Sequence, residues 1–351
     1  MKTAVIGAGA IGSVVAAYLT KAGQDVTLIG RENQVKAISA NGLKVKGARG
    51  EETIHVKALP RLDQEYDLVI FTVKTQDIES AVNTNQVFLR NALILSSQNG
   101  VQADLHLKES FRQENMFSSI VMFGSTYVQP GEVTFNFEGD WIIGKPFEPV
   151  DDKTEEIAKF LQTAFPVVVS EDIVGMKWLK LFVNFNNCIP ALTGKSMQET
   201  FADMGLCRLS IILLAEGIKI IEKAGIAPVS LPKFPVERIV GLAQMPIDQA
   251  AGIINKTLTT LSKEPLYGSI LQSIMRGRPS EIDYINGEIV RLARQLQIDA
   301  PLNEKVVGMV HHVENTGEYF TIKTVKEELN LNGAPRKRSV FRSIINFLKR
   351  S

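Results

Sequence analysis

The chain has 351 residues, of which 45% are apolar and 22% are charged, and its formal net charge is +1 at pH 7. This composition excludes a disordered chain, a collagen and a coiled coil. The near-neutral charge balance argues against a nucleic-acid-binding protein, which needs a surplus of cationic groups. Because a single core stops growing at roughly 250 to 300 residues, we expect two domains.

The cysteine and histidine content bears on metals and on the redox compartment. Two cysteines, Cys188 and Cys207, are too few for a disulfide framework. Four histidines show no metal-ligand spacing with these cysteines: His55, His106, His311 and His312. We therefore expect a cytosolic protein without a structural metal.

The N-terminal residues form the most informative motif. Residues 2–6 (KTAVI) are an apolar run of strand length, and they lead directly into Gly7-Ala8-Gly9-Ala10-Ile11-Gly12. A helix with an apolar stripe follows and ends before Gly23, and residues 25–29 (DVTLI) predict the next strand. This order predicts a Rossmann-type dinucleotide site, and it argues against a signal peptide in the uncharged residues 3–20.

The residues after the second predicted strand indicate which dinucleotide binds. NAD enzymes usually have Asp or Glu here for the ribose 2′-hydroxyl, but this strand ends in Gly30-Arg31. The guanidinium of Arg31 suits a 2′-phosphate, which favours NADP over NAD. The neighbouring Glu32 leaves NAD as the alternative.

Two further buried strands are predicted at residues 67–73 and 92–96. They end in Lys74-Thr75 and in Gln98-Asn99-Gly100. The carboxyl ends of strands are where open α/β sheets bind ligands, so Lys74 and Asn99 are candidate site residues. The alternative is that they are solvated loop residues.

The pattern changes near residues 166–172. Long amphipathic segments follow, such as 206–223 and 280–296, and the four prolines in 228–246 predict a loop or broken helices. The fold class is therefore α/β, with an N-terminal Rossmann-type parallel sheet and a C-terminal all-helical domain. We place an NADP-binding domain at 1–168, a helical substrate and dimerisation domain at 169–333, and a tail at 334–351.

Residues 177–188 are apolar apart from one polar face, and we expect them to be helical up to about Pro190. Lys180, Asn184 and Asn187 share this face because their spacing is i, i+4, i+7. A polar ligand would satisfy the asparagines. A hydrated surface stripe or a hydrogen-bond network between domains would do so equally well.

Several motifs occur together in this chain: GAGAIG with Arg31, Thr72-Val73-Lys74, Gln98-Asn99-Gly100, Trp178-x-Lys180-Leu181-x-x-Asn184 before Ala191-Leu192-Thr193-Gly194, and Ser269 followed by residues 281–287 (EIDYING). Together they resemble the ketopantoate reductase (2-dehydropantoate 2-reductase) family, which pairs a Rossmann domain with a helical domain. The resemblance extends from residue 1 to about residue 312.

The resemblance implies NADPH-dependent reduction of 2-dehydropantoate to pantoate, in pantothenate biosynthesis. It assigns Lys180 as general acid, Asn184 and Ser269 as substrate ligands, and Lys74, Asn99 and Glu281 to the cofactor side, with Asn99 also near substrate. We add Asn187 to the substrate ligands because it shares a helix face with Asn184. Lys177 is the rival acid, but the family places its lysine two residues after the tryptophan.

Two departures from the family pattern affect the substrate pocket. Cys188 stands where the family commonly has a second asparagine, and Ser273 stands where it often has aspartate. Another 2-oxo acid is therefore an alternative substrate. An NADP-binding regulatory module is the alternative of a different class, but such a module needs none of the substrate residues. We also expect a homodimer.

The last stretch of the chain, residues 335–351, carries six basic residues and no acidic one. An apolar stripe predicts a basic amphipathic helix: Val340, Phe341, Ile344, Ile345 and Leu348. Such a helix could bind an anionic membrane or a partner. We favour the alternatives, which are docking on its own acidic body or on a neighbouring subunit, or disorder.

Overall fold

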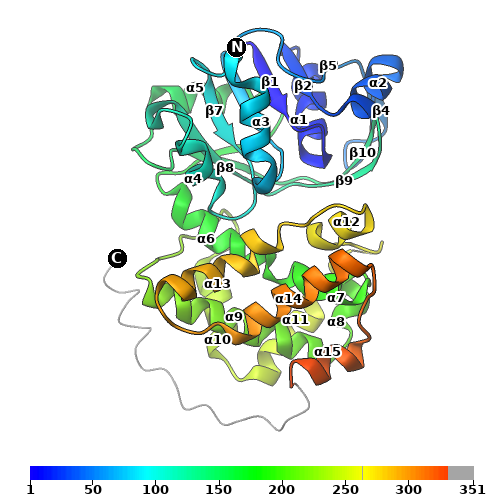
Figure 1. Ribbon diagram of the computed structural model, residues 1–351, viewed down its shortest axis with the longest axis vertical. Coiled ribbons are helices and arrows are strands. Elements are labelled where there is room, and N and C mark those ends of the chain that lie inside the picture. Colours follow the sequence, from blue (N-terminus) through cyan, green and yellow to red (C-terminus); the bar gives the residue numbers. More distant parts are fainter. Residues whose placement is uncertain (263, 331–351) are drawn as a thin grey trace. The chain divides into compact units, whose positions relative to one another are not determined.

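The computed structural model describes residues 1–262 and 264–330, which form two compact units (Figure 1). The first unit comprises Met1–Leu181 and Ala227–Phe234, and the second comprises Phe182–Ile226 and the described residues from Pro235 onward. The units therefore divide between Leu181 and Phe182, within one helix, whereas the sequence places the boundary at 168/169. The predicted tail helix lies outside the described residues.

An eight-stranded sheet in the order β12-β11-β8-β7-β6-β1-β2-β5 forms the centre of the first unit. All neighbours are parallel except β11 and β8. From β5 to β8 this is the strand order of a doubly wound dinucleotide-binding fold. The strands are β1 (Thr3–Ile6), β2 (Val26–Ile29), β5 (Lys57–Leu59), β6 (Leu68–Phe71), β7 (Leu93–Ser96), β8 (Met116–Val121), β11 (Trp141–Gly144) and β12 (Val167–Val169).

Helices cover both faces of this sheet because its strands are apolar on both sides. In β1, Val5 belongs to the core cluster on the α1 and α5 side, whereas Ala4 and Ile6 belong to the cluster on the α3 and α4 side. The helices of this unit are α1 (Ala10–Lys21), α2 (Glu32–Asn41), α3 (Ile78–Asn85), α4 (Ala103–Lys108) and α5 (Asp152–Gln162), with 3₁₀ turns η1 (Thr75–Asp77), η2 (Gln86–Phe88) and η3 (Gln113–Asn115).

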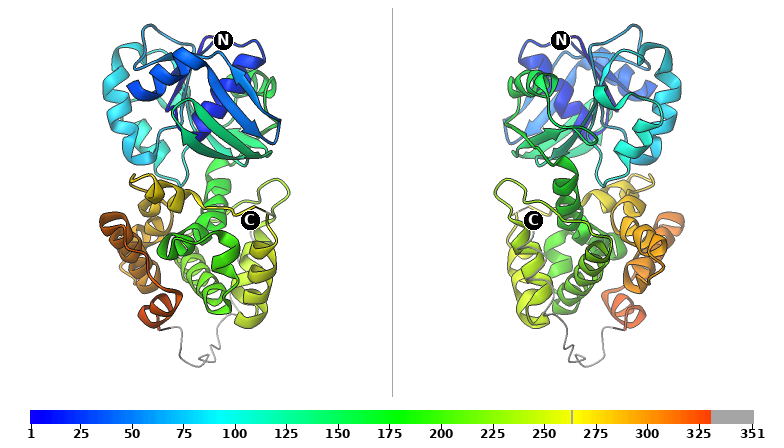
Figure 2. Two further views of the ribbon diagram at one scale, coloured as in Figure 1. Left: turned by 90° about the vertical axis from the view of Figure 1, so that its right-hand side faces the viewer. Right: turned by 90° about the vertical axis from the view of Figure 1, so that its left-hand side faces the viewer.

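A second sheet of four strands, in the order β4-β3-β10-β9, was not predicted from the sequence. Its strands β9 and β10 pack against α1 and cover the helix that follows the glycine motif (Figure 2). Val45, Val133 and Phe135 of this sheet join the α1 core cluster. The strands are β3 (Leu43–Gly47), β4 (Glu52–Ile54), β9 (Gly124–Gln129) and β10 (Glu132–Phe137).

Helix α6 (Ile173–Asn184) begins in the first unit and ends in the second. Its start is fixed by Asp172, whose Oδ1 accepts a hydrogen bond from the backbone N–H of Gly175 at 2.7 Å. The carbonyl of Gly175 also accepts a hydrogen bond from Val229 N at 3.0 Å. This contact explains why residues 227–234 belong to the first unit.

The second unit is helical in its described residues, as the sequence predicts. Helix α9 lies at its centre and packs against α10, α11, α13 and α14 (Figure 1). The elements are η4 (Phe185–Asn187), α7 (Cys188–Thr193), α8 (Met197–Phe201), α9 (Met204–Lys223), α10 (Val236–Gln244), α11 (Ile247–Thr259), α12 (Ser269–Met275), η5 (Ile282–Tyr284), α13 (Asn286–Gln295), α14 (Pro301–Thr316) and α15 (Ile322–Glu328).

The amphipathic segment 280–296 is not one continuous helix, because η5 precedes α13 and the backbone of Ile285 is not helical. The backbone N–H of Ser280 is bound by Glu314 Oε1 at 2.7 Å, and Asp283 Oδ1 lies 2.9 Å from His311 Nε2. Both partners belong to α14, so tertiary contacts determine this turn. None of the described helices is long and apolar enough to cross a membrane.

Candidate active site

The glycine motif occupies the tight connection between β1 and α1. Gly7 has a φ of +121°, and a Cβ there would lie 2.6 Å from Val73 N. A Cβ on Gly12 would lie 2.0 Å from the carbonyl oxygen of Gly7. Gly9 differs, because it is exposed and a Cβ would meet no atom within 4 Å. The first and last glycines are thus required by packing, whereas the middle one leaves open space where a ligand can approach.

The N-terminus of α1 opens onto this space. Gly9 is the N-cap residue of α1, and no side chain caps the helix. No acidic residue lies in the first turn of α1. The first hydrogen bond at the start of α1 runs from Ser13 N to Gly9 O at 3.0 Å. The N–H groups of Ala10, Ile11 and Gly12 come before it and therefore have no acceptor within the helix. Such N–H groups, at the positive end of the helix dipole, bind anions. Ala8 packs elsewhere, since a Cβ on Gly30 would lie 2.5 Å from Ala8 Cβ.

Two residues to which the sequence assigns no role, Thr72 and Gln98, hold the loops around the glycine motif. Thr72 Oγ1 donates to the carbonyl of Gly7 at 2.8 Å. Gln98 Nε2 donates to the carbonyls of Phe71 and Val73 at 3.0 Å each, and its Oε1 accepts from Ser97 N. These bonds join the loop carrying Lys74 to the loop carrying Asn99. The signal in the sequence is their place immediately after predicted buried strands.

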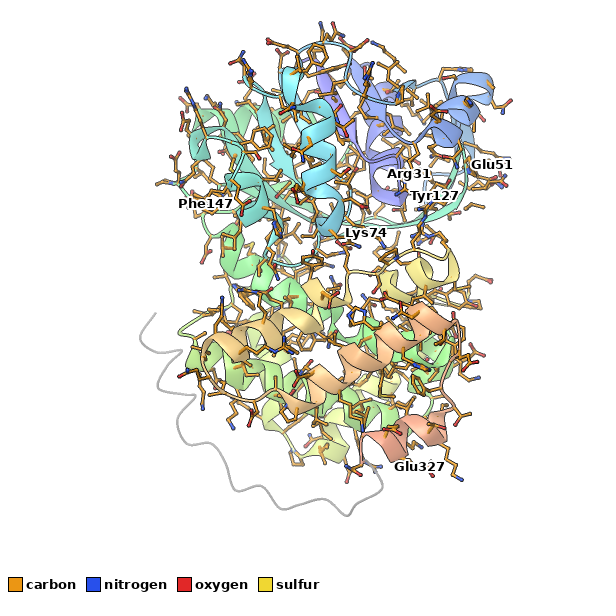
Figure 3. All side chains as sticks on the ribbon, in the orientation of Figure 1. Arg31, Glu51, Lys74, Tyr127, Phe147 and Glu327 are labelled. Carbon is orange, nitrogen blue, oxygen red and sulfur yellow. The ribbon has the colours of Figure 1, made fainter. Side chains whose placement is uncertain are left out.

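Arg31 follows β2 and Gly30 and forms the N-cap position of α2, where it is exposed. Arg31 is labelled in Figure 3, as is Tyr127 of β9, whose Oη donates to Gln34 Oε1 in α2 at 3.2 Å. The acidic neighbour Glu32 lies 3.5 Å from Lys36 in the same helix. Among the described residues, no carboxylate forms an ion pair with Arg31.

The two lysines of α6 have different surroundings. Lys177 is buried, and its Nζ lies 2.7 Å from Asp104 Oδ2. Lys180 is partly buried, and among the described residues of its unit no carboxylate forms an ion pair with it. Burial lowers the pKa of Lys180 from 10.5 to about 8. An ammonium with this pKa can act as a general acid near neutral pH, whereas Lys177 is held in a salt bridge.

The residues after Lys180 do not continue as one α-helix. Asn184 is the last residue of α6, and the 3₁₀ turn η4 leads to Asn187. Because side chains three residues apart eclipse each other in a 3₁₀ turn, Asn184 and Asn187 lie on one face. Cys188 instead points into the core, where its Sγ donates to Phe185 O at 3.0 Å and burial raises its pKa to about 12.

Ser269, the first residue of α12, lies beside Asn187 within the second unit. Asn187 Nδ2 is 3.5 Å from Ser269 Oγ. A Cβ on Gly268 would lie 2.6 Å from Asn187 Oδ1, so the glycine allows this approach. Ser273 is buried and donates to the carbonyl of Ser269 at 2.9 Å, which means that it supports α12.

Glu281 lies at the N-cap position of η5, in the turn that Glu314 and His311 fix. The predicted site residues are therefore divided between the units. Gly7 to Gly12, Arg31, Lys74, Asn99 and Lys180 belong to the first unit, and Asn184, Asn187, Ser269 and Glu281 belong to the second. Within the described part of the chain, no group of three or more His, Cys, Asp or Glu side chains is placed to hold a metal ion.

Comparisons with known proteins agree with this architecture. The family model described as ketopantoate reductase PanE/ApbA matches residues 3–146, and the model of the C-terminal domain of the same family matches residues 172–314. A 2-dehydropantoate 2-reductase of Pyrococcus horikoshii is 30% identical over 320 residues, which cover 90% of this chain and 99% of the relative.

Solved structures show the same fold. A PanE/ApbA family ketopantoate reductase from Ralstonia eutropha JMP134 superposes with a TM-score of 0.76 at 29% identity, covering 90% of this chain and 99% of that one. D-mandelate dehydrogenase, solved with NADH and anilino(oxo)acetate, has a TM-score of 0.77 at 21% identity, with the same coverage. With both halves matched in order, the chain belongs to the ketopantoate reductase family, whose members are oxidoreductases acting on CH–OH and C=O groups.

Proposed function

We propose that this protein catalyses the NADPH-dependent reduction of 2-dehydropantoate to pantoate, in pantothenate biosynthesis. The observation that carries the proposal is Lys180. It has no carboxylate partner within its described unit, and burial lowers its pKa to about 8. The names of the relatives, 2-dehydropantoate 2-reductases at 30% identity and below, support the choice of substrate.

The residues around the glycine motif fit a dinucleotide. The open space at Gly9 and the uncapped start of α1 suit the pyrophosphate. The guanidinium of Arg31 would bind a 2′-phosphate, which is the basis for NADPH rather than NADH. Lys74, Asn99 and Glu281 would line the remainder of the cofactor site. When bound, the cofactor supplies a hydride from C4 of its nicotinamide to the ketone carbon.

Lys180 has two tasks in this reaction. Its ammonium donates a hydrogen bond to the ketone oxygen and stabilises the negative charge that develops there. It then transfers one proton to that oxygen, so the ketone becomes an alcohol and Lys180 becomes a neutral amine that solvent reprotonates. Asn184, Asn187 and Ser269 would hold the substrate through hydrogen bonds from amide and hydroxyl groups.

A second candidate is the reduction of another 2-oxo acid. One observation favours it: Cys188, which stands where the family commonly has a second asparagine, is buried in the core and offers no amide to a substrate. The homodimer and the cytosolic location stay predictions.

The experiment that tests the proposal is NADPH oxidation by the purified protein over a panel of 2-oxo acids with and without a hydroxyl on the adjacent branch. We expect the highest kcat/KM for 2-dehydropantoate. A higher value for a 2-oxo acid without the hydroxyl supports the second candidate. If the protein binds NADPH but reduces no member of the panel, it acts instead as a regulatory module.

A further inference from the structure

The ion pair of Lys177 and Asp104 is buried within the first unit. The two side chains are 3% and 5% exposed, and their charged atoms lie 2.7 Å apart. Ser118 Oγ donates to Asp104 Oδ2 at 2.7 Å, and Ser96 Oγ donates to Oδ1. Two hydroxyls and one ammonium therefore satisfy the carboxylate, as a buried charge requires.

This pair connects α6 to the edge of the sheet where the predicted site lies. Ser96 is the last residue of β7 and precedes Asn99 by three positions. Asp104 lies in the first turn of α4. Lys177 lies on α6, three residues before Lys180, so the two lysines are neighbours on the helix surface. The salt bridge thus joins the helix of the proposed acid to the strand end that leads to Asn99.

We propose that Lys177 and Asp104 are positioning residues that fix helix α6, and with it the ammonium of Lys180, at the carboxyl edge of the sheet. The inference rests on the proposed function in that Lys180 is taken as the acid. The pair is neutral overall, so it holds the helix without placing a net charge next to Lys180. A hydrophobic contact would not specify the rotation of the helix in the same way, because apolar packing is not directional.

The test separates the charge of the pair from its role as an anchor. Lys177→Met removes the ammonium three residues before Lys180 and leaves the Asp104 carboxylate held only by two serine hydroxyls. We expect the pKa of Lys180, and the basic limb of kcat/KM, to rise by roughly 1. The double variant Asp104→Asn/Lys177→Met removes both charges, so the pKa should return to its wild-type value. Its kcat should stay about ten-fold low, since the anchor is lost.

Lys145→Met is the matched control. Lys145 is equally buried, with a side chain that is 3% exposed, and its Nζ lies 2.8 Å from Asp151 Oδ2. It follows the end of β11, and its Nζ donates to Glu114 O, which precedes β8, so its ammonium lies at the amino end of β8, away from Ser96. We expect this variant to lower Tm while kcat and the pH profile stay as in the wild type.

The pKa of Lys180 can be measured without turnover, by NMR titration of ¹³C-dimethylated lysines. The resonance of Lys180 is the one that is missing from the spectrum of Lys180→Arg. A protein that reduces no 2-oxo acid would contradict the proposed function, yet this titration would still test the pair. A Lys180 pKa that is the same in wild type and Lys177→Met overturns the inference. If Lys177→Met does not fold, the double variant decides, and a kcat within about two-fold of wild type overturns it.

Discussion

Lys177 and Lys180 lie three residues apart on α6, and their ammonium groups have opposite environments. Lys177 is held by Asp104 at 2.7 Å, whereas Lys180 has no carboxylate partner within its described unit. Burial lowers the pKa of Lys180 to about 8. This difference supports the choice of Lys180 as the acid, which the sequence bases on its place after Trp178.

The charge of Lys180 should reduce the stability of the fold. The folded pKa of about 8 lies below the ordinary value of 10.5, so the desolvation cost of the ammonium is fully present below pH 8 and disappears as pH rises toward 10.5. Lys180→Met should therefore raise Tm by about 2 to 4 °C near neutral pH, as measured by calorimetry.

Lys180→Arg, which keeps a charge at this position, is the control for this measurement and should show no such rise. A lower Tm for Lys180→Met than for the wild type would show that the ammonium stabilises the fold. In that case the explanation of its low pKa by burial would be incorrect.

Arg31 should determine the preference between cofactors. Arg31→Ala should weaken NADPH binding by roughly ten- to a hundred-fold and leave NADH binding nearly unchanged, because only NADPH has the 2′-phosphate. Fluorescence titration of both cofactors measures the two dissociation constants. Equal losses for NADPH and NADH would refute this role of Arg31.

The glycines of the motif should respond differently to alanine. Gly9 has open space and a φ of −84°, so Gly9→Ala should leave Tm unchanged but weaken NADPH binding about ten-fold or more by blocking the approach of the pyrophosphate. Gly12→Ala should lower Tm, because its Cβ would lie 2.0 Å from Gly7 O. If Gly9→Ala binds NADPH as the wild type does, the pyrophosphate does not approach at Gly9.

The C-terminal tail should be dispensable for the chemistry. Every residue assigned to the site precedes it, so deletion after Gly333 should leave NADPH oxidation largely intact. Steady-state assays of the full and truncated chains compare the two. Lost activity with an unchanged circular dichroism spectrum would mean that the tail completes the site or an oligomer. Flotation with anionic liposomes tests membrane binding separately.

The strands that carry the glycine motif, Lys74 and Asn99 could be predicted because each is a short apolar run that ends in a polar residue or glycine. The second sheet could not, since β3 pairs with β10, which lies far along the chain. Such a pairing depends on the packing of α1 and has no local signal. In the same way, the roles of Gln98 and Asp104 follow from partners on other strands and helices.

The face shared by Asn184 and Asn187 was predicted from helical spacing, but the structure produces it by a 3₁₀ turn. A pattern of apolar and polar residues does not distinguish the two geometries over so few residues. The turn also explains the position of Cys188. One residue beyond Asn187, it is directed into the core, where its side chain is fully buried.

The measurement that tests the account most directly is the pH dependence of kcat/KM for NADPH oxidation with 2-dehydropantoate, in wild type and Lys180→Ala, from about pH 6 to about pH 10. The wild type should reduce 2-dehydropantoate, and its kcat/KM should fall as pH rises through about 8, because Lys180 then loses its proton. Lys180→Ala should bind NADPH normally, lack this basic limb and have a kcat about a hundred- to ten-thousand-fold lower. No turnover of 2-dehydropantoate by the wild type, or the same basic limb in Lys180→Ala, would contradict the account.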